Sequence, residues 1–337
     1  MSMLSKRDFL RAGLAVGATT AFGRLPAQAA EETLLIYNGQ HRPMTEAAVN
    51  AFTKATGIKV TVRQGESSQL ANQIIEEGAN SPADLFYSEQ SPPCAALDEK
   101  GLLAPADAET VKQIPAAYAS TNKTWLGTTM RCRVVAYNKA MVKASDLPSS
   151  IIDIATPAWK DKVGYVIRDG FQEQVMAIVK LKGKDAALAW LKGLKANGRL
   201  YNGNGAAMKA VEAGEIATVL VNNYYWFALA KESGAENMKS ALHYVAKGDA
   251  GALVNLSPAG VLKTAKNAAA AQKFLAFLVS EEGQKVLVST YAEYPVRVGI
   301  ASPYLIKPLD EIGSTVSPMD VGSAQLSYDL QKEAGLL

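Results

Sequence analysis

Residues 33–87 decide the fold, because apolar β-favouring runs alternate there with amphipathic segments: TLLIY (33–37), EAAVNAFTK (46–54), KVTV (59–62), QLANQIIEE (69–77) and DLFY (84–87). The short runs rich in Leu, Ile, Val, Phe and Tyr are typical of strands, and the longer segments have the spacing of helices with one buried face. This alternation predicts an α/β fold in which helices cover largely parallel sheets.

The same alternation continues through the chain. Further strands are predicted at Val134–Tyr137, Val163–Ile167, Ala217–Val221 and Ala252–Leu256, and further helices at Gln172–Leu181, Asp185–Leu194 and Ala206–Ala213. Neither a low-complexity linker nor a fixed-period repeat interrupts it. A chain of 337 residues is too long for one compact core and has the length of two ordinary lobes.

The N-terminus has the composition of an export signal. The signal features are a basic start at Lys6, Arg7 and Arg11, an apolar stretch over residues 12–22, and the small-residue cleavage site Ala27-Gln28-Ala29. Residues 1–29 are therefore predicted to be removed, and the mature protein is expected in the periplasm. Residues 5–11 resemble a twin-arginine (Tat) signal with Lys6 in place of the first arginine, so Tat-like and Sec export both remain open. No apolar run of about 20 residues follows, so no stable membrane insertion is expected after signal removal.

The charge balance of the mature chain argues against two classes of partner. The 35 basic and 32 acidic residues include four basic residues (Lys6, Arg7, Arg11, Arg24) and one acid (Asp8) in the predicted signal. Removing the signal leaves 31 of each sign, so nucleic acid and anionic membrane surfaces lose their electrostatic attraction.

The two cysteines, Cys94 and Cys132, leave one question open. An exported protein can form a disulfide, but sequence alone does not show whether these two residues come within bonding range. Neither a CxxC motif nor a Cys/His cluster occurs, which excludes a structural zinc site and a redox motif.

Polar and aromatic residues follow three of the predicted strands. The continuations are Asn38-Gly39-Gln40-His41, Ser88-Glu89-Gln90 and Asn222-Asn223-Tyr224-Tyr225-Trp226. Ligands in open α/β sheets collect at the carboxyl ends of strands. If His41, Glu89, Tyr224 and Tyr225 converge, they supply one imidazole nitrogen, one carboxylate and two phenol oxygens.

This donor set suits ferric iron (Fe3+) better than other common cations. A free phenol has a pKa of ~10, so only a strongly polarising ion would ionise two phenols near neutral pH. Two phenolates and one carboxylate also balance the three charges of Fe3+. Each residue alone has an ordinary explanation, since tyrosine and tryptophan often pack as surface aromatics, His41 suits a helix terminus and Glu89 suits a first helical turn.

Together these segments resemble the bacterial ferric-ion-binding periplasmic proteins, also called bacterial transferrins. The resemblance spans nearly the whole mature chain and is carried by residues 37–41, 53–60, 81–90, 178–183, 222–226 and 292–295, with NGQH, FYSEQ and NNYYW as its most specific parts. The paired helical stretches 268–278 and 280–287 also resemble the closing helices of solute-binding proteins from ATP-driven importers.

The resemblance implies a two-lobed periplasmic binding protein of type II-like architecture, with ligand in the interlobe cleft. The first lobe would comprise residues 31–133 plus 255–305, and the second residues 134–254 plus 306–337. His41, Glu89, Tyr224 and Tyr225 match the four protein ligands of the family. A synergistic anion such as phosphate or carbonate would be held by Gln90, Asn204 and Asn222, whose amides donate hydrogen bonds.

The sequence departs from the family at Arg168-Asp169-Gly170, where relatives have a Ser-Gly-Ala loop whose amides bind the anion. Gly170, in this segment, is expected to be an anion-binding residue. Arg168 could hold the anion through a charge-assisted pair or could pair with Asp169 and face solvent, and Asp169 would repel an anion. Arg131 and Arg133 match basic positions of the family, for which only an indirect role is expected.

We therefore expect a monomeric protein that is not an enzyme, closes around Fe3+ and delivers it to an inner-membrane ABC permease. One alternative on the same fold is a solute-binding protein for a small organic or anionic solute. Another is a secreted enzyme that uses His41 and Glu89 as general base and acid, which gives no reason for the paired tyrosines. Motifs for nucleophilic hydrolysis and nucleotide binding do not occur.

Overall fold

The computed structural model describes residues 33–317, 321 and 324–337, except for the side chain of Asp169. The predicted export signal at residues 1–29 lies outside the described residues. None of the helices within the described ranges combines the length and the hydrophobicity that crossing a bilayer requires.

The first three strands and the helices between them follow the predicted alternation. Strands β1 (Thr33–Asn38), β2 (Lys59–Gln64) and β3 (Leu85–Tyr87) pair in parallel, with β1 between the other two. They alternate with α1 (Arg42–Thr56), α2 (Ser67–Glu77) and α3 (Ser91–Glu99). The pairing is parallel because a helix returns the chain to the same end of the sheet before each new strand.

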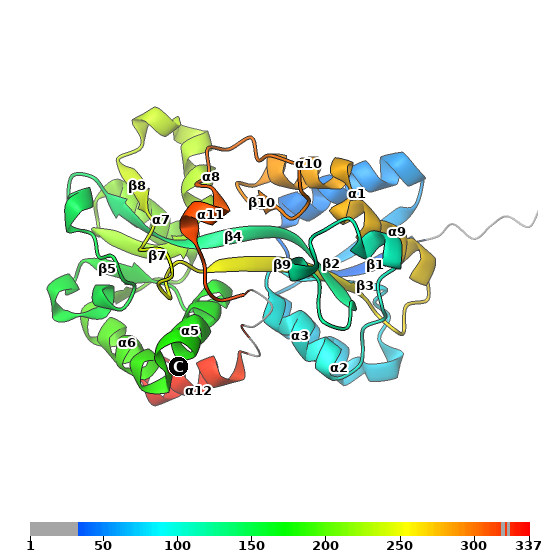
Figure 1. Cartoon of the computed structure of the whole chain (residues 1–337), viewed down its shortest axis with the longest axis horizontal. Helices are drawn as coiled ribbons and strands as arrows, with labels where there is room; N and C mark the ends of the chain where they lie inside the picture. Colours follow the sequence, from blue (N-terminus) through cyan, green and yellow to red (C-terminus); the bar gives the residue numbers. More distant parts are fainter. Residues whose placement is uncertain (1–32, 318–320, 322–323) are drawn as a thin grey trace, which may run out of the picture. The chain divides into compact units, whose positions relative to one another are not determined.

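Two long antiparallel strands, β4 (Trp125–Asn138) and β9 (Val254–Val261), join the group of β1, β2 and β3 to the rest of the sheet. In β4, the residues from Trp125 to Cys132 pair with β9, and those from Arg133 onward pair with β7 (Thr218–Asn222). Figure 1 shows β4 and β9 lying side by side between the two groups of strands.

Three further strands and five helices form a second group together with β7. It contains β5 (Val163–Tyr165), β6 (Arg199–Leu200) and β8 (Ser240–His243), with α5 (Asp169–Lys182), α6 (Lys184–Asn197), α7 (Asn204–Ala213), α8 (Asn223–Ser233) and α12 (Gln325–Glu333). The C-terminal α12 packs beside α5 and α6 (Figure 1). The other elements are α4 (Ala108–Val111), α9 (Ala268–Val279), α10 (Glu281–Thr290), β10 (Tyr294–Pro295) and α11 (Leu309–Ile312).

The predicted α/β fold class is confirmed, with one difference in the sheet. Pairs β1–β2, β1–β3, β5–β6 and β5–β7 are parallel, whereas β3–β9 and all pairs of β4 are antiparallel. The sheet is therefore mixed rather than mainly parallel, because two strands that carry the chain in opposite directions lie at its centre. Sheet partners change between Cys132 and Arg133, and the exact lobe boundaries stay a prediction.

The predicted pair of closing helices forms α9 and α10. Helix α9 buries Phe274, Leu275 and Leu278, and Ser280 caps α10 by accepting a hydrogen bond from the Gly283 amide at 3.0 Å. A Cβ on Gly283 would lie 1.8 Å from the Phe277 carbonyl oxygen. Glycine is therefore required where the two helices meet.

The two thiols are not joined. Cys94 and Cys132 are both free and buried, which answers the question that the sequence left open. The Cys132 Sγ lies 3.7 Å from the Tyr294 hydroxyl.

Candidate metal centre

A tight turn after β1 positions His41, which directly precedes α1. Gly39 makes this turn possible, because a Cβ there would lie 2.1 Å from Ser67 Oγ at the start of α2. The His41 amide donates to Gln40 Oε1 at 2.7 Å. The imidazole is 13% exposed, so this loop holds it at the carboxyl end of β1.

The main chain of Glu89 is held by serines from two other elements. Its amide donates to Ser67 Oγ at 3.0 Å, and its carbonyl accepts from Ser257 Oγ of β9 at 2.9 Å. The side chain is 18% exposed. Glu89 therefore projects from a loop that is fixed on both sides.

The two tyrosines lie in the first turn of α8, immediately after β7. Every residue of β7 is buried, and Asn222 forms the N-terminal cap position of α8. Tyr224 is 1% exposed, and its ring centroid is 4.5 Å from that of Tyr225. The sequence predicted the position of this pair after the strand, whereas the helix itself was not predicted.

The structure brings the imidazole, the carboxylate and the phenols together. The Tyr224 hydroxyl donates to Glu89 Oε1 at 3.0 Å, and His41 Nε2 lies 3.9 Å from the same oxygen. The His41 and Tyr224 rings contact edge to face at 4.8 Å. Tyr225 joins through its ring contact with Tyr224. We refer to His41, Glu89, Tyr224 and Tyr225 as the donor cluster.

Both phenols of the donor cluster are hard to ionise in the ion-free protein. Burial and the negative charge of Glu89 raise the pKa of Tyr224 well above its ordinary value. The same two causes raise the pKa of Tyr225 to about 12. Both phenols are therefore protonated near neutral pH, and a ligand that needs phenolates must displace their protons.

Two arginines of β4, Arg131 and Arg133, lie near the donor cluster, and each has different partners. Arg131 is fully buried, donates to Ser257 Oγ at 2.8 Å and lies 3.6 Å from Glu173 Oε2. Burial lowers the pKa of Arg131, but the charges of Glu173, Glu89 and Glu293 raise it further, so it ends above its ordinary value. The neighbourhood is thus rich in negative charge.

Arg133 is buried without such a carboxylate. Its Nη1 donates to Asn222 Oδ1 at 3.1 Å, and no ion pair of Arg133 occurs among the described residues. Burial lowers the pKa of its guanidinium to about 10. A buried cation with one amide partner favours an anion beside it.

The three amides predicted to hold an anion lie near the donor cluster. Asn222 Nδ2 donates to the Tyr224 hydroxyl and Asn204 Nδ2 to the Tyr225 hydroxyl, both at 3.2 Å. Gln90 is buried next to Glu89, and its Oε1 accepts no hydrogen bond within the described part of the chain. The structure therefore couples two of the amides directly to the phenols.

Within Arg168-Asp169-Gly170, where the sequence departs from the family, Gly170 lies beside buried side chains and Arg168 is exposed. An added Cβ on Gly170, in the first turn of α5, would lie 3.2 Å from Arg133 Nη1 and 3.3 Å from Asn222 Oδ1. Arg168 is 54% exposed, and its Nη1 lies 3.1 Å from Glu66 Oε1 at the start of α2. Arg168 faces solvent, as one alternative predicted, with Glu66 as its partner; the side chain of Asp169 lies outside the described residues.

Sequence reasoning did not assign two residues that contact His41. The Tyr291 ring stacks on the imidazole at a centroid distance of 4.5 Å, and Glu293 Oε1 lies 3.7 Å from His41 Nε2. Glu293 is fully buried, and burial raises the pKa of its carboxyl group. The position of Glu293 between Ala292 and Tyr294 was the sequence signal that could have indicated a buried acid.

A metal bound here would need the phenol oxygens. Within the described residues, no group of three or more His, Cys, Asp and Glu side chains is arranged to hold a metal ion. The donor cluster contributes only His41 and Glu89 of these types. Two phenol oxygens complete four donors, three of them oxygens, which suits a hard trivalent cation.

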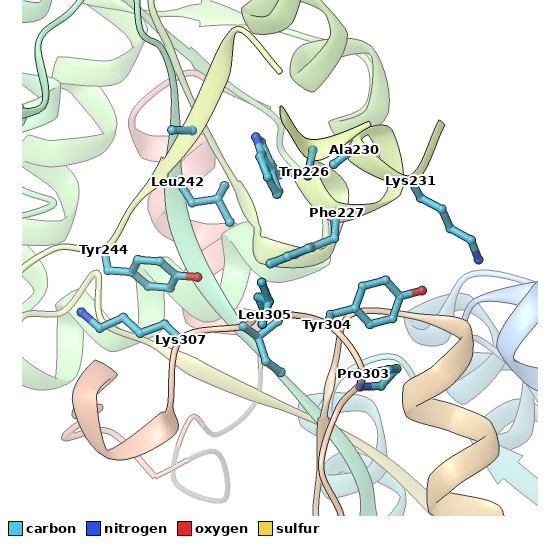
Figure 2. Close-up of a pocket in the computed structure, with 13 residues that line it drawn as sticks. Trp226, Phe227, Ala230, Lys231, Leu242, Tyr244, Pro303, Tyr304, Leu305 and Lys307 are labelled. Carbon is cyan, nitrogen blue, oxygen red and sulfur yellow. The ribbon is translucent and has the colours of Figure 1, made fainter. Parts of the chain in front are cut away.

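A separate groove of about 730 Å³ lies beside α8 and is lined by residues of this helix between Trp226 and Lys231. Figure 2 shows Phe227 and Leu242 lining it opposite Tyr304 and Leu305. None of the four donor residues lines this groove. Its mostly apolar wall suits neither a metal ion nor a small anion.

Comparison with known proteins gives consistent results. Residues 47–308 match the family described as bacterial extracellular solute-binding protein. The chain is 43% identical to the major ferric iron-binding protein of Neisseria meningitidis serogroup B, covering 97% of this chain and 98% of that one. It is 38% identical to the Fe(3+)-binding periplasmic protein of Serratia marcescens, covering 96% of each.

A solved structure is similar over the same length. Iron-bound HitA from Pseudomonas aeruginosa has a TM-score of 0.88 to this chain and 46% sequence identity, covering 90% of this chain and 99% of that one. The structural similarity therefore covers most of the chain.

Proposed function

This chain belongs to the bacterial extracellular solute-binding proteins, among the ferric iron-binding periplasmic proteins, and we propose that it captures Fe3+ in the periplasm and delivers it to an inner-membrane ABC permease. In this proposal it acts as a monomer and as a carrier, not as an enzyme. The cargo is released unchanged, so no group of the donor cluster needs to act as a catalytic base or acid.

The contact between the Tyr224 hydroxyl and Glu89 is the observation that carries the proposal. These two groups follow β3 and β7, which β9 and β4 separate in the sheet, and they meet at 3.0 Å. His41 Nε2 lies 3.9 Å from the same carboxylate oxygen. Binding of Fe3+ would replace the phenol proton between the two oxygens. The ion would then gain two phenolates and one carboxylate, which balance its three charges.

We propose that the ion holds two lobes together. His41 and Glu89 belong to the predicted first lobe, and Tyr224 and Tyr225 belong to the second. An ion that binds ligands from both lobes has a higher affinity for the closed form, and this difference in affinity drives closure. Strands β4 and β9, which run between the two groups of strands, would contain the hinge.

A synergistic anion such as phosphate or carbonate would complete the coordination sphere. Asn222, Asn204 and Gln90 are its proposed donors, and the Gly170 amide in the first turn of α5 would add to them. The buried Arg133 beside Asn222 supports an anion there, because its guanidinium has no carboxylate partner among the described residues. Arg168 could bind the anion only after breaking its ion pair with Glu66.

A ferric titration followed by visible absorption tests the proposal. The mature protein is titrated with ferric nitrilotriacetate, with phosphate, carbonate and citrate compared. We expect a phenolate-to-iron charge-transfer band that saturates at one ion per chain. A protein that stays colourless and shows no ferric-dependent rise in melting temperature would refute iron capture. Binding of an organic solute in its place would favour the alternative on the same fold.

A further inference from the structure

We propose that the groove beside α8 is a second binding site, which takes an amphipathic organic anion with an apolar body and one carboxylate or sulfonate group. Its lining comes from α8, from the segment of β8 and Tyr244, and from residues 303–307. The donor cluster does not line it, so this site would serve a function other than iron capture.

The groove has the size and the surface of a small-molecule site. Its volume of about 730 Å³ lies within the range of roughly 300–1,000 Å³ that is usual for ligand pockets. Phe227 and Leu242 line it opposite Tyr304 and Leu305 (Figure 2). Leu305 is 97% exposed, and large apolar side chains gathered at an exposed concave surface favour an apolar ligand. The body of the ligand is therefore apolar.

Contacts within the protein hold the aromatic walls of the groove in place. Trp226 Nε1 donates to the Ser240 carbonyl oxygen, and the Tyr304 hydroxyl donates to the Ser289 carbonyl oxygen, both at 3.3 Å. The Phe227 ring contacts Trp226 and Tyr304 edge to face, at centroid distances of 5.1 and 5.9 Å. The polar edges of these rings thus have partners already, and a ligand loses little affinity to the ordering of the walls.

The charged side chains of the lining are both cations. Lys231 and Lys307 line the groove, and no carboxylate occurs among its described lining residues. Neither lysine forms an ion pair within the part of the chain that the structure describes. Figure 2 shows the two lysines on opposite sides of Leu305, and Lys307 Nζ lies 5.1 Å from the centre of the Tyr244 ring. Two cations without a counter-ion favour an anionic group on the ligand.

The apolar walls and the two ammonium groups have different effects on binding. Burial of the apolar body against the rings would supply most of the affinity. The lysines would supply less, because an exposed charge pair contributes little, but they would select an anion over a cation of the same shape. An uncharged or positively charged molecule therefore fits this groove less well than an amphipathic anion.

A fluorescence titration of the mature protein with anilinonaphthalene sulfonate, an aromatic anion, tests the site. We expect saturable binding of one probe per chain, at temperatures where the protein is folded, and displacement of the probe by decanoate. Decyltrimethylammonium has an alkyl chain of the same kind and the opposite charge. It should displace the probe about fivefold less effectively, because it gains nothing from the lysines.

Leu305→Asp is the most informative variant, because Leu305 is 97% exposed and its replacement leaves the core intact. The new carboxylate would lie in the groove and repel the anionic probe, so the affinity should fall by more than about tenfold. Val298→Asp is the matched control, because Val298 is 81% exposed and does not line this groove. Lys231→Gln and Lys307→Gln should each weaken binding of the probe by about two- to fivefold.

Absence of saturable binding would overturn the proposal, as would equal displacement by decanoate and decyltrimethylammonium. Equal losses in Leu305→Asp and Val298→Asp would overturn it too, because the probe would then bind elsewhere. Sedimentation velocity tests the other occupant, a second copy of this chain. A dimer that Leu305→Asp dissociates would assign the groove to self-association, whereas a monomer with a saturable probe site supports the proposal.

Discussion

The donor cluster and the first turn of α5 are neighbours, joined through Asn222, but they differ in how their side chains are held. In the donor cluster, Tyr224 is 1% exposed and its hydroxyl contacts both Glu89 and Asn222. Arg168, which directly precedes α5, is 54% exposed and pairs with Glu66. A buried group with several partners has more to lose than an exposed group with one.

This difference predicts a gradient of effects. Substitutions in the donor cluster remove groups that the ion would bind, and they leave neighbouring buried groups without partners. Substitutions at the first turn of α5 change an anion contact or an exposed ion pair. The following expectations run from the first region to the second.

The largest effect is expected from removing either phenol. Tyr224→Phe and Tyr225→Phe should each weaken ferric binding by more than about 100-fold, because a lost ligand costs more than a lost supporting residue. The visible band should weaken strongly in both. Competition with a ferric chelator measures the affinity. Tyr304→Phe, a tyrosine of the separate groove, serves as control, and an equal loss in that variant would contradict the assignment.

The two phenol variants should differ in the ion-free protein. Tyr224→Phe removes the hydrogen bond to Glu89 and the acceptor for Asn222, both in a buried place. Tyr225→Phe removes the acceptor for Asn204 and leaves the contact between Tyr224 and Glu89 in place. Thermal unfolding without iron should therefore show a larger destabilisation for Tyr224→Phe, by roughly 1–3 kcal/mol.

The next effect is a dependence of ferric affinity on pH. The pKa of Tyr224 is raised, and that of Tyr225 is raised to about 12, so both phenols carry protons at pH 6–8 without iron. Binding must release those protons, and apparent affinity should rise with pH by about tenfold per unit for each proton released. A pH indicator in weak buffer should detect about two protons per ion from the phenols. Binding without proton release would contradict phenolate ligation.

The donor cluster could be predicted from sequence more fully than its surroundings. His41, Glu89 and Tyr224 each follow a strand, and strand ends are predictable because alternation of strand and helix is a local property. The contact of Glu293 with His41 was not predictable in this way, because it depends on how the segment after α10 packs against the start of α1. The antiparallel pairing of the two central strands was also not predicted, since Trp125–Cys132 pairs with β9 over a long sequence separation.

A smaller effect is expected at Gly170, where the first turn of α5 meets Arg133 and Asn222. Gly170→Ala would place a Cβ 3.2 Å from Arg133 Nη1 and should displace that pair. We expect the gain in ferric affinity from added phosphate to fall by roughly tenfold, the size of a lost supporting contact. Gly205→Ala is a matched control, because Gly205 has the same place in α7 and nothing within 4 Å of its Cβ position. An identical response of both variants would exclude an anion role for this turn.

The smallest effect is expected from the Arg168–Glu66 pair, which joins the starts of α5 and α2. Both side chains are about half exposed, at 54% and 51%, and exposed ion pairs contribute about 0.2–1 kcal/mol. Arg168→Ala should therefore change ferric affinity by less than about fivefold, and salt should remove the difference. Lys285→Ala, which breaks an exposed pair within α10, should leave ferric affinity unchanged.

The phosphate dependence of the Arg168 variant separates the two roles that the sequence left open. If Arg168 only pairs with Glu66, Arg168→Ala and Glu66→Ala lose the same small amount of affinity, and the double variant loses no more than either. If Arg168 holds the anion, Arg168→Ala loses the phosphate effect while Glu66→Ala keeps or increases it, because removing Glu66 frees the guanidinium. The first outcome is expected, because Arg168 already has a carboxylate partner at 3.1 Å, whereas the buried Arg133 beside Asn222 has none among the described residues.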